Sequence, residues 1–246
     1  MKTQILTAAT ALALSAGMAM AASHSMTVRM GTEGAYPPYN FINDAGEVDG
    51  FERELGDELC ARAELTCEWV TNDWDSIIPN LVSGNYDTII AGMSITDERD
   101  EVIDFTQAYI PPDPSLYVAL SEDADLTGGV IAAQAGTIQA SHVAESGATL
   151  VEFATPEETI AAVKNGEADA VLADGAYLEP IAAQDPALVI AGDPVMLGGG
   201  IGMGLRESDD DLQAKFDAAI SAMKEDGTLN AMIRKWFGDD ANTFDM

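Results

Sequence analysis

The chain has 246 residues, of which 47% are hydrophobic, enough to form the core of one large domain or two small ones. Its 42 acidic residues outnumber its 11 basic ones, and the formal net charge of −31 excludes nucleic acids and anionic membranes as partners, because both would repel it. The two histidines, His24 and His142, and the acidic residues show no metal-ligand spacing, so the sequence predicts no metal and no cofactor.

The N-terminus predicts a secretion signal. Lys2 precedes an apolar stretch that runs to Ala22, and Ala19-Met20-Ala21 supplies the small residues of a signal-peptidase site. We therefore expect a signal peptide over residues 1–21 and export to the periplasm. A membrane anchor is the alternative interpretation of the same stretch.

The first half of the chain alternates predicted strands and helices, which implies a parallel sheet. The predicted elements are a strand over Thr27–Thr32, a helix over Phe51–Leu65, a strand over Cys67–Val70, a helix over Asp75–Ser83 and a strand over Asp87–Ala91.

The only two cysteines, Cys60 and Cys67, stand at the predicted turn from helix to strand. In an oxidising compartment, an even number of closely spaced cysteines predicts one disulfide that closes this loop. Two buried free thiols are the alternative.

Two breaks in composition divide the chain. Pro111-Pro112-Asp113-Pro114 cannot continue a helix or a central strand. The glycine run over 198–204 lacks dinucleotide-binding spacing and favours a flexible crossing or close backbone packing. The predicted elements beyond the first break are strands over Gly129–Ala133, Thr149–Glu152, Ala168–Leu172 and Ala187–Ala191, and helices over Pro156–Asn165, Asp209–Lys224 (capped by Ser208) and Thr228–Phe237.

The breaks predict an α/β protein of two lobes joined by two crossing strands. Residues 22–112 plus 199–246 would form a discontinuous first lobe, and residues 113–198 a continuous second lobe. Such a pair of lobes encloses a cleft that can close on a small molecule.

Arg99 is the first candidate for a residue in that cleft. It follows the apolar run Thr88-Ile89-Ile90-Ala91 and a loop of small residues, and ligands of α/β sheets bind beyond the carboxyl ends of strands. A guanidinium there would bind a carboxylate through two parallel hydrogen bonds. A solvated helix start is the alternative for Arg99.

Motifs along nearly the whole mature chain resemble those of periplasmic substrate-binding proteins of polar-amino-acid ABC importers, above all the lysine/arginine/ornithine- and histidine-binding group. The motifs are Gly31-Thr32-Glu33, Tyr36-Pro37-Pro38, Gly50-Phe51, Asp73-Trp74-Asp75, Gly92-Met93-Ser94-Ile95-Thr96, Gln134-Ala135-Gly136-Thr137, Ala170-Val171-Leu172-Ala173-Asp174, Gly202-Met203-Gly204-Leu205-Arg206 and Lys235-Trp236-Phe237. This resemblance implies the two-lobed type II periplasmic-binding-protein fold, with two parallel-type sheets and a ligand cleft between the lobes.

The resemblance also implies a ligand site. Arg99 would hold the ligand α-carboxylate and Asp174 its α-ammonium, while Tyr36 and Trp74 would sandwich the ligand side chain and Glu33 would accept from its basic end. The remaining site positions are Gly92, Met93, Ser94, Thr137 and Ile138, the last of which replaces a hydroxyl residue frequent in the cation-binding group. Core packing of Tyr36 and Trp74, a helix N-cap role for Asp174 and a turn-capping role for Glu33 are the structural alternatives.

The expected function is that of a periplasmic receptor, a monomer without enzymatic activity. It would capture arginine, lysine, ornithine or histidine by lobe closure and deliver it to an inner-membrane ABC permease. A receptor for glutamine, an opine or another polar amino acid is one alternative. A periplasmic enzyme like cyclohexadienyl dehydratase, with Glu33 as its acid or base, is another.

Overall fold

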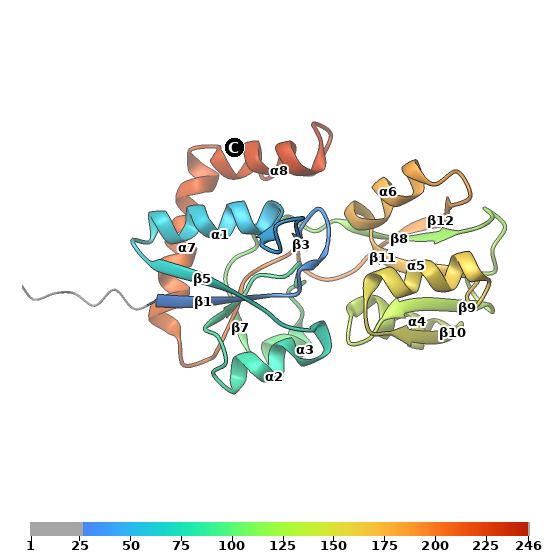
Figure 1. Ribbon diagram of the computed structural model, residues 1–246, viewed down its shortest axis with the longest axis horizontal. Coiled ribbons are helices and arrows are strands. Elements are labelled where there is room, and N and C mark those ends of the chain that lie inside the picture. The colour runs from blue at the N-terminus through green and yellow to red at the C-terminus, as the bar shows by residue number, and fades with distance from the viewer. Residues whose placement is uncertain (1–26, 246) are drawn as a thin grey trace, which may run out of the picture.

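The computed structural model describes residues 27–245 and shows two α/β lobes side by side, each built around a five-stranded sheet (Figure 1). The predicted signal peptide, residues 1–21, lies outside the described residues. Within residues 27–245, no helix is long and apolar enough to cross a membrane.

The sheet of the first lobe has the strand order β5-β1-β6-β13-β7. Strand β1 pairs in parallel with β5 and β6, whereas β13 runs antiparallel to β6 and β7. The strands are β1 (Thr27–Thr32), β5 (Thr66–Thr71), β6 (Thr88–Ile89), β7 (Asp104–Phe105) and β13 (Gly204–Leu205), and a small separate sheet contains β2 (Ala35–Tyr36), β3 (Asn40–Ile42) and β4 (Val48–Asp49). The helices are α1 (Phe51–Arg62), the 3-10 turn η1 (Trp74–Ser76), α2 (Ile77–Val82), α3 (Asp97–Asp100), α7 (Asp210–Glu225) and α8 (Thr228–Phe237).

The sheet of the second lobe has the order β10-β9-β11-β8-β12. Strands β10, β9 and β11 are parallel, and β8 runs antiparallel to both β11 and β12. Its elements are β8 (Pro114–Ala119), β9 (Val130–Gln134), α4 (Ile138–Ser146), β10 (Thr149–Phe153), α5 (Pro156–Asn165), β11 (Ala170–Asp174), α6 (Gly175–Gln184) and β12 (Val189–Met196).

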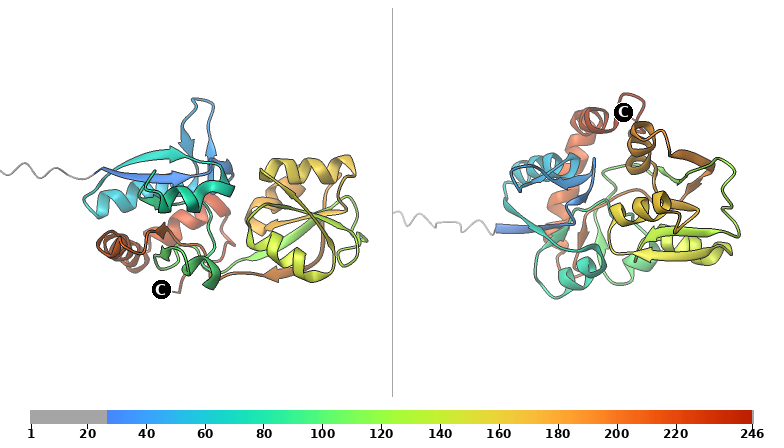
Figure 2. Two further views of the ribbon diagram at one scale, coloured as in Figure 1. Left: turned by 90° about the horizontal axis from the view of Figure 1, so that it is seen from below. Right: turned by 45° about the vertical axis from the view of Figure 1, so that its right-hand side comes forward.

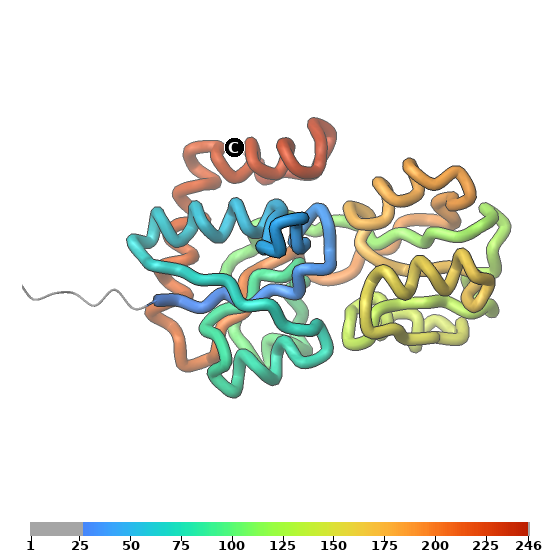
Figure 3. The backbone as a smooth tube through the Cα atoms, in the orientation of Figure 1, coloured from blue at the N-terminus to red at the C-terminus, as the bar shows by residue number. Residues whose placement is uncertain are grey.

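The chain crosses between the lobes twice, over residues 106–113 and 197–203 (Figures 2 and 3). The crossings pair where the Ile201 N–H donates to the Ile110 carbonyl over 3.0 Å. Gly200 has φ +96°, and a Cβ there would lie 2.6 Å from that same carbonyl oxygen, so the close backbone packing predicted for the glycine run is confirmed.

The crossings also correct the prediction of purely parallel sheets. The chain leaves the first lobe after β7 and re-enters it at β13, so the returning strand runs against its neighbours. In the second lobe, β8 was not predicted because its start is proline-rich. Pro114 is the first residue of β8, a position at which proline is tolerated.

Most predicted helices form where the sequence places them. Phe51, Leu55 and Leu59 bury one face of α1 completely. Helix α5 begins as predicted because Thr155 and Glu158 form a capping box and Pro156 occupies the first turn.

Other predicted bounds were wrong. The helix over Asp75–Ser83 is a 3-10 turn followed by the short α2, and the strand over Asp87–Ala91 is reduced to β6. The N-cap of α7 is Asp209 instead of Ser208, whose hydroxyl donates to the Asp209 carboxylate over 3.2 Å.

The disulfide prediction is confirmed. Cys60 in α1 and Cys67 in β5 are joined, with their Cα atoms 6.2 Å apart. The bridge fixes the end of α1 to the edge strand of the first sheet.

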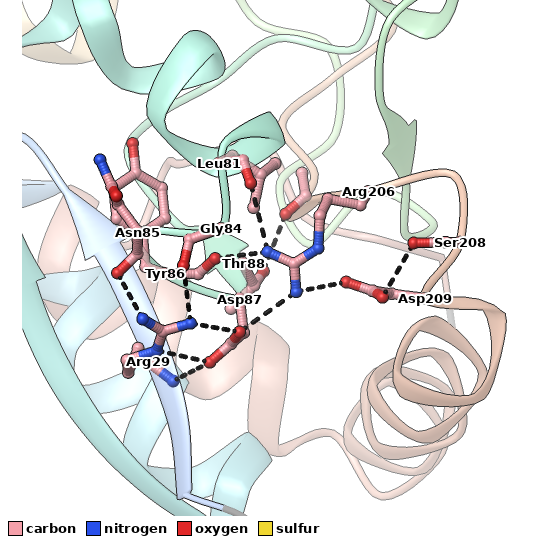
Figure 4. A network of polar contacts seen from close by, with 11 residues as sticks. Arg29, Leu81, Gly84, Asn85, Tyr86, Asp87, Thr88, Arg206, Ser208 and Asp209 are labelled. Carbon is pink, nitrogen blue, oxygen red and sulfur yellow. Dashed lines mark hydrogen bonds and ion pairs between the residues drawn. The ribbon is translucent and has the colours of Figure 1, made fainter.

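Asp87 joins three parts of the first lobe in one charged network (Figure 4). Its carboxylate accepts from the Arg29 guanidinium of β1 over 2.8 and 3.0 Å, and from Arg206, beyond β13, over 3.1 Å. Arg206 also pairs with Asp209 at the start of α7 over 2.7 Å. Through these cations the pKa of Asp87 falls from 3.8 to about 2, although partial burial of the carboxyl opposes the shift.

We predict that Asp87→Asn lowers the free energy of unfolding at pH 7 by about 2 kcal/mol, the value of a pKa difference of this size. A lowered pKa stabilises the fold above pH 3.8, and the contribution is lost as the pH falls through about 2. Urea unfolding of both proteins should therefore give stabilities that converge in acid. Asp57→Asn, which removes an exposed ion pair with Arg53, serves as the control with almost no effect. A stability gap that is equal at pH 7 and pH 2 would contradict this account.

Candidate functional site

A cavity between the lobes contains about 480 Å³ of empty space, including the part that opens to solvent. Its wall combines the segments that follow β1, β5 and β6 in the first lobe with the ends of β9 and β11 and the starts of α4 and α5 in the second. The lining residues are Glu33, Tyr36, Trp74, Ala91, Gly92, Ser94, Arg99, Gln134, Thr137, Ile138, Gln139, Pro156, Thr159, Leu172, Ala173 and Asp174. The strand ends place this cavity where α/β sheets bind ligands.

Arg99 contributes a half-buried cation to this wall. Its guanidinium donates to the carbonyl oxygens of Ser94 over 2.8 Å and Gly136 over 3.4 Å, and it lies 5.4 Å from the ring centre of Trp74. Within residues 27–245, no carboxylate oxygen lies within 4.0 Å of a guanidinium nitrogen of Arg99. Burial lowers the pKa of Arg99 to about 10, so the side chain stays charged at neutral pH while lacking a counter-ion.

Asp174 contributes an anion to the same cavity. Its carboxylate accepts from the Tyr36 hydroxyl over 2.8 Å and from the Gln139 side-chain amide over 2.9 Å. Burial raises the pKa of Asp174, while these two hydrogen bonds and the charge of Arg99 favour the ionised form. Asp174 occupies the N-cap position of α6, as the structural alternative predicted, but its side chain makes no capping hydrogen bond.

Glu33 contributes a second carboxyl group, just beyond the end of β1. The Gln134 side-chain amide of the second lobe donates to it over 2.6 Å. Burial raises the pKa of Glu33 from 4.5 to about 7, and the hydrogen bond from Gln134 opposes this shift. The carboxyl group therefore changes charge within the physiological pH range.

The two predicted aromatic residues both line the cavity. Tyr36 stacks on Tyr39 at 5.5 Å and on Tyr177 of the second lobe at 4.4 Å between ring centres. The Trp74 ring faces Arg99, and its indole N–H donates to the Gly136 carbonyl over 3.3 Å. A ligand side chain sandwiched between Tyr36 and Trp74 stays a prediction.

Among the other predicted site positions, Gly92, Ser94, Thr137 and Ile138 lie in the wall. Thr137 caps α4 by accepting from the Ala140 N–H over 3.1 Å, which aims that helix N-terminus at the cavity.

Met93 does not line the cavity, so a ligand contact from its side chain is not supported. The side chain is fully buried in the core of the first lobe with Ile77 and Leu81.

Several wall residues were not predicted, notably Gln134, Gln139 and Thr159. Gln134 stands in a motif that carried the resemblance, at the end of a predicted strand, and that position could have identified it. Gln139 and Thr159 lie inside helices, where the sequence gives no sign of which side faces a cleft.

Five hydrogen bonds cross the cavity from lobe to lobe, two of them between Tyr36 and Asp174. They join Tyr36 to Asp174, Gln134 to Glu33, and both Trp74 and Arg99 to the Gly136 carbonyl. The lobes therefore meet around the cavity through the same side chains that line it. Among residues 27–245, no cluster of three or more His, Cys, Asp or Glu side chains could hold a metal ion.

Comparison with known proteins identifies the family. The model of the bacterial extracellular solute-binding proteins, family 3, matches residues 28–239. The chain belongs to this family. The family predicted from the order of the motifs is therefore confirmed.

Curated relatives match over almost their whole length. The chain is 31% identical to the lysine/arginine/ornithine-binding periplasmic protein of Escherichia coli strain K12, with 96% of this chain and 97% of the relative covered. It is 32% identical to the L-arginine-binding protein of Pseudomonas aeruginosa, with 87% and 88% covered.

Solved structures show the same fold. A crystal structure of a periplasmic His/Glu/Gln/Arg/opine family-binding protein from Silicibacter pomeroyi in complex with lysine is 78% identical, with a TM-score of 0.87, and covers 88% of this chain and 100% of its own. An ancestral arginine-binding protein bound to glutamine is 32% identical, with a TM-score of 0.80 and coverage of 87% and 98%. The predicted two-lobed type II fold is confirmed, with mixed rather than parallel sheets.

We predict that the Glu33 carboxyl group titrates near pH 7 in the ligand-free protein, because burial disfavours its charge. Gln134→Leu should raise this pKa further, since it removes the donor that stabilises the ionised form. Carbon-13 NMR of glutamate side-chain carboxyl groups measures both values, with Glu33→Gln to assign the signal. A Glu33 pKa near 4.5 in the wild type would contradict the burial argument.

Proposed function

We propose that this chain is a periplasmic receptor of an ABC importer that binds an α-amino acid with a cationic side chain. One observation carries the proposal: Arg99 and Asp174 line the same cavity, and each lacks an oppositely charged partner within 4.0 Å in the described part of the chain. The family membership and the names of the relatives support it.

The two charges match the two charges of an amino-acid backbone. A zwitterion that leaves water must have both ends paired, because an unpaired buried ion costs several kcal/mol. Arg99 would bind the α-carboxylate with its free donors, helped by the Ser94 hydroxyl and by the N-terminus of α4 at Thr137. Asp174 would accept from the α-ammonium group.

Glu33 favours a ligand with a basic side chain. A carboxyl group with a pKa of about 7 loses its proton readily when a cation arrives, so binding a lysine- or arginine-type side chain would shift it to the ionised form. Lysine, arginine, ornithine and histidine are the favoured ligands. Glutamine and opines are the neutral or mixed-charge alternatives.

Closure of the lobes would couple capture to delivery. Ligand contacts from both lobes stabilise the closed form over the open one, which is the requirement for a ligand-driven change. We place the lobe boundaries near residues 112 and 199, with residues 22–112 plus 199–246 in one lobe and 113–198 in the other. Residues 1–21 would direct export, and a monomer would present the closed form to the inner-membrane permease.

An enzymatic function is the second candidate. Glu33, with its pKa of about 7, has the property of a general acid or base, and an ancestral amino-acid-binding protein that is a precursor of cyclohexadienyl dehydratase is 28% identical to this chain, with a TM-score of 0.76. Incubation with prephenate and arogenate distinguishes the two candidates. The receptor proposal expects no turnover.

A thermal-shift screen over the common amino acids, followed by calorimetry, tests the ligand class. The protein is first unfolded and refolded to remove any amino acid that co-purified with it. A cationic amino acid should raise the melting temperature most. Tighter binding of glutamine or another neutral amino acid than of all four cations would contradict the proposed class, and the absence of any amino-acid binding would contradict the receptor.

We predict that Arg99→Ala weakens binding of the preferred amino acid by about 3–5 kcal/mol, because removal of one buried charge leaves its partner unpaired. Arg99→Lys should also fail, since the planar two-donor geometry is lost. Arg53→Ala, which removes an exposed arginine paired with Asp57, is the matched control and should bind like the wild type. Calorimetry that finds Arg99→Ala within a few-fold of the wild type would remove Arg99 from the proposed site.

A further inference from the structure

A third carboxyl group, fully buried, lies behind the wall of the cavity. Glu52, in the first turn of α1, is 0% exposed and is absent from the cavity lining. Within residues 27–245, no lysine or arginine nitrogen lies within 4.0 Å of the Glu52 carboxylate. A buried anion of this kind persists only when hydrogen-bond donors compensate its charge.

Three donors surround this carboxylate. The Gly92 N–H donates to Oε1 over 2.6 Å, and the Asn40 side-chain amide donates to Oε2 over 2.7 Å. The Tyr109 hydroxyl is also hydrogen-bonded to Oε1. Backbone and amide N–H groups can only donate, so Glu52 accepts the bonds from Gly92 and Asn40. Burial raises the pKa of Glu52, and the hydrogen bonds from Tyr109, Gly92 and Asn40 oppose this shift by favouring the ionised form.

Each donor belongs to a segment that shapes the cleft. Gly92 lies in the cavity wall itself. Asn40 links Glu52 to the Glu33–Gly34 loop, because its side-chain oxygen accepts from the Gly34 N–H over 2.7 Å. Tyr109 lies in the first crossing between the lobes, where its N–H donates to the Ile201 carbonyl over 2.8 Å.

We infer that Glu52 is a positioning residue, whose carboxylate fixes the Gly92 loop and the Glu33–Gly34 loop to the crossing segment, so that the first lobe presents a preformed half of the binding cleft. The inference rests on the proposed function, because it takes the cavity to be the ligand site. A preformed half-site binds more tightly because less conformational entropy is lost on binding.

The substitution Glu52→Gln exposes this role because it keeps the shape and changes one acceptor into a donor. With the new NH₂ group on the Oε1 side, it faces the Gly92 N–H. With the glutamine NH₂ group on the Oε2 side, it faces the NH₂ group of Asn40. Rotating the Asn40 amide removes that clash but places the Asn40 NH₂ group against the Gly34 N–H. Every arrangement therefore leaves two donors facing each other in the chain of bonds that holds the loops.

The double variant Glu52→Gln/Asn40→Asp restores a matching partner for every group. The glutamine amide then donates to the new carboxylate at position 40, whose other oxygen accepts from the Gly34 N–H, while the glutamine oxygen accepts from Gly92 and Tyr109. The exchange transfers the negative charge from position 52 to position 40 and keeps all the donors paired.

The experiment measures L-lysine affinity by calorimetry, at a temperature at which circular dichroism shows every variant to be folded. Glu52→Gln should bind about tenfold or more weakly, the value of one lost charged hydrogen bond, and Asn40→Asp alone should also bind weakly because two carboxylates then face each other. The double variant should return to within about threefold of the wild type. Asn230→Ala is the matched control, because it removes two hydrogen bonds of a buried side chain to Phe244, outside the cavity lining, and should lower the melting temperature without a change in affinity.

Hydrogen exchange in the ligand-free proteins gives a second readout that does not depend on the ligand. The amides of Gly34 and Gly92 should exchange faster in Glu52→Gln and regain protection in the double variant. Equal protection and equal affinity in Glu52→Gln and wild type would overturn the positioning role, as would a double variant no better than Glu52→Gln. If the wild type binds no amino acid, the proposed function fails, and the exchange data alone decide the role of Glu52.

Discussion

A guanidinium that leaves bulk water must have its charge compensated, and in this protein Arg99 donates hydrogen bonds only to neutral groups. Two carbonyl oxygens accept from it, and the Trp74 ring lies beside it. Asp174, the carboxylate whose charge acts on it most strongly, is held by Tyr36 and Gln139 instead of pairing with it. The structure thus keeps a cation and an anion apart in one cavity, and the zwitterion that we propose as ligand would pair with both.

Two other charged groups of the first lobe, Asp87 and Glu52, differ from Arg99 because their partners are already in place. Asp87 is shared between Arg29 and Arg206, and Glu52 accepts from three neutral donors. Arg29 lies within β1, while Glu33 follows the last residue of that strand. The same sheet therefore carries saturated charges that stabilise the fold and, beyond its strand ends, unsaturated charges that suit a ligand.

The sequence predicted the elements that depend on local patterns. Helix α5, with its capping box and proline, and α8 form over the predicted residues, and the Cys60–Cys67 bridge follows from spacing and compartment. The pairing of strands that are distant in the sequence could not be predicted from local patterns. The antiparallel crossings require the chain to return through β13, and Pro114 begins a central strand that its composition argued against.

Much of the candidate site was predicted from the same motifs that indicated the family. Arg99, Asp174 and Glu33 each follow a recognisable strand or motif, so their places in the wall could be expected. Met93 shares a motif with Gly92 and Ser94 but points into the core, because side-chain direction depends on a register that the motif does not show. The connection of Glu52 to three separate segments depends on tertiary packing alone.

The most direct test of the account compares L-lysine with two analogues that each lack one backbone charge. Cadaverine lacks the carboxylate that Arg99 would bind, and 6-aminohexanoate lacks the α-ammonium group that Asp174 would bind. The account predicts that calorimetry finds each analogue at least about a hundredfold weaker than L-lysine, since each leaves one charge of the cavity unpaired. Binding of either analogue within about tenfold of L-lysine would contradict the pairing of both charges by a zwitterion.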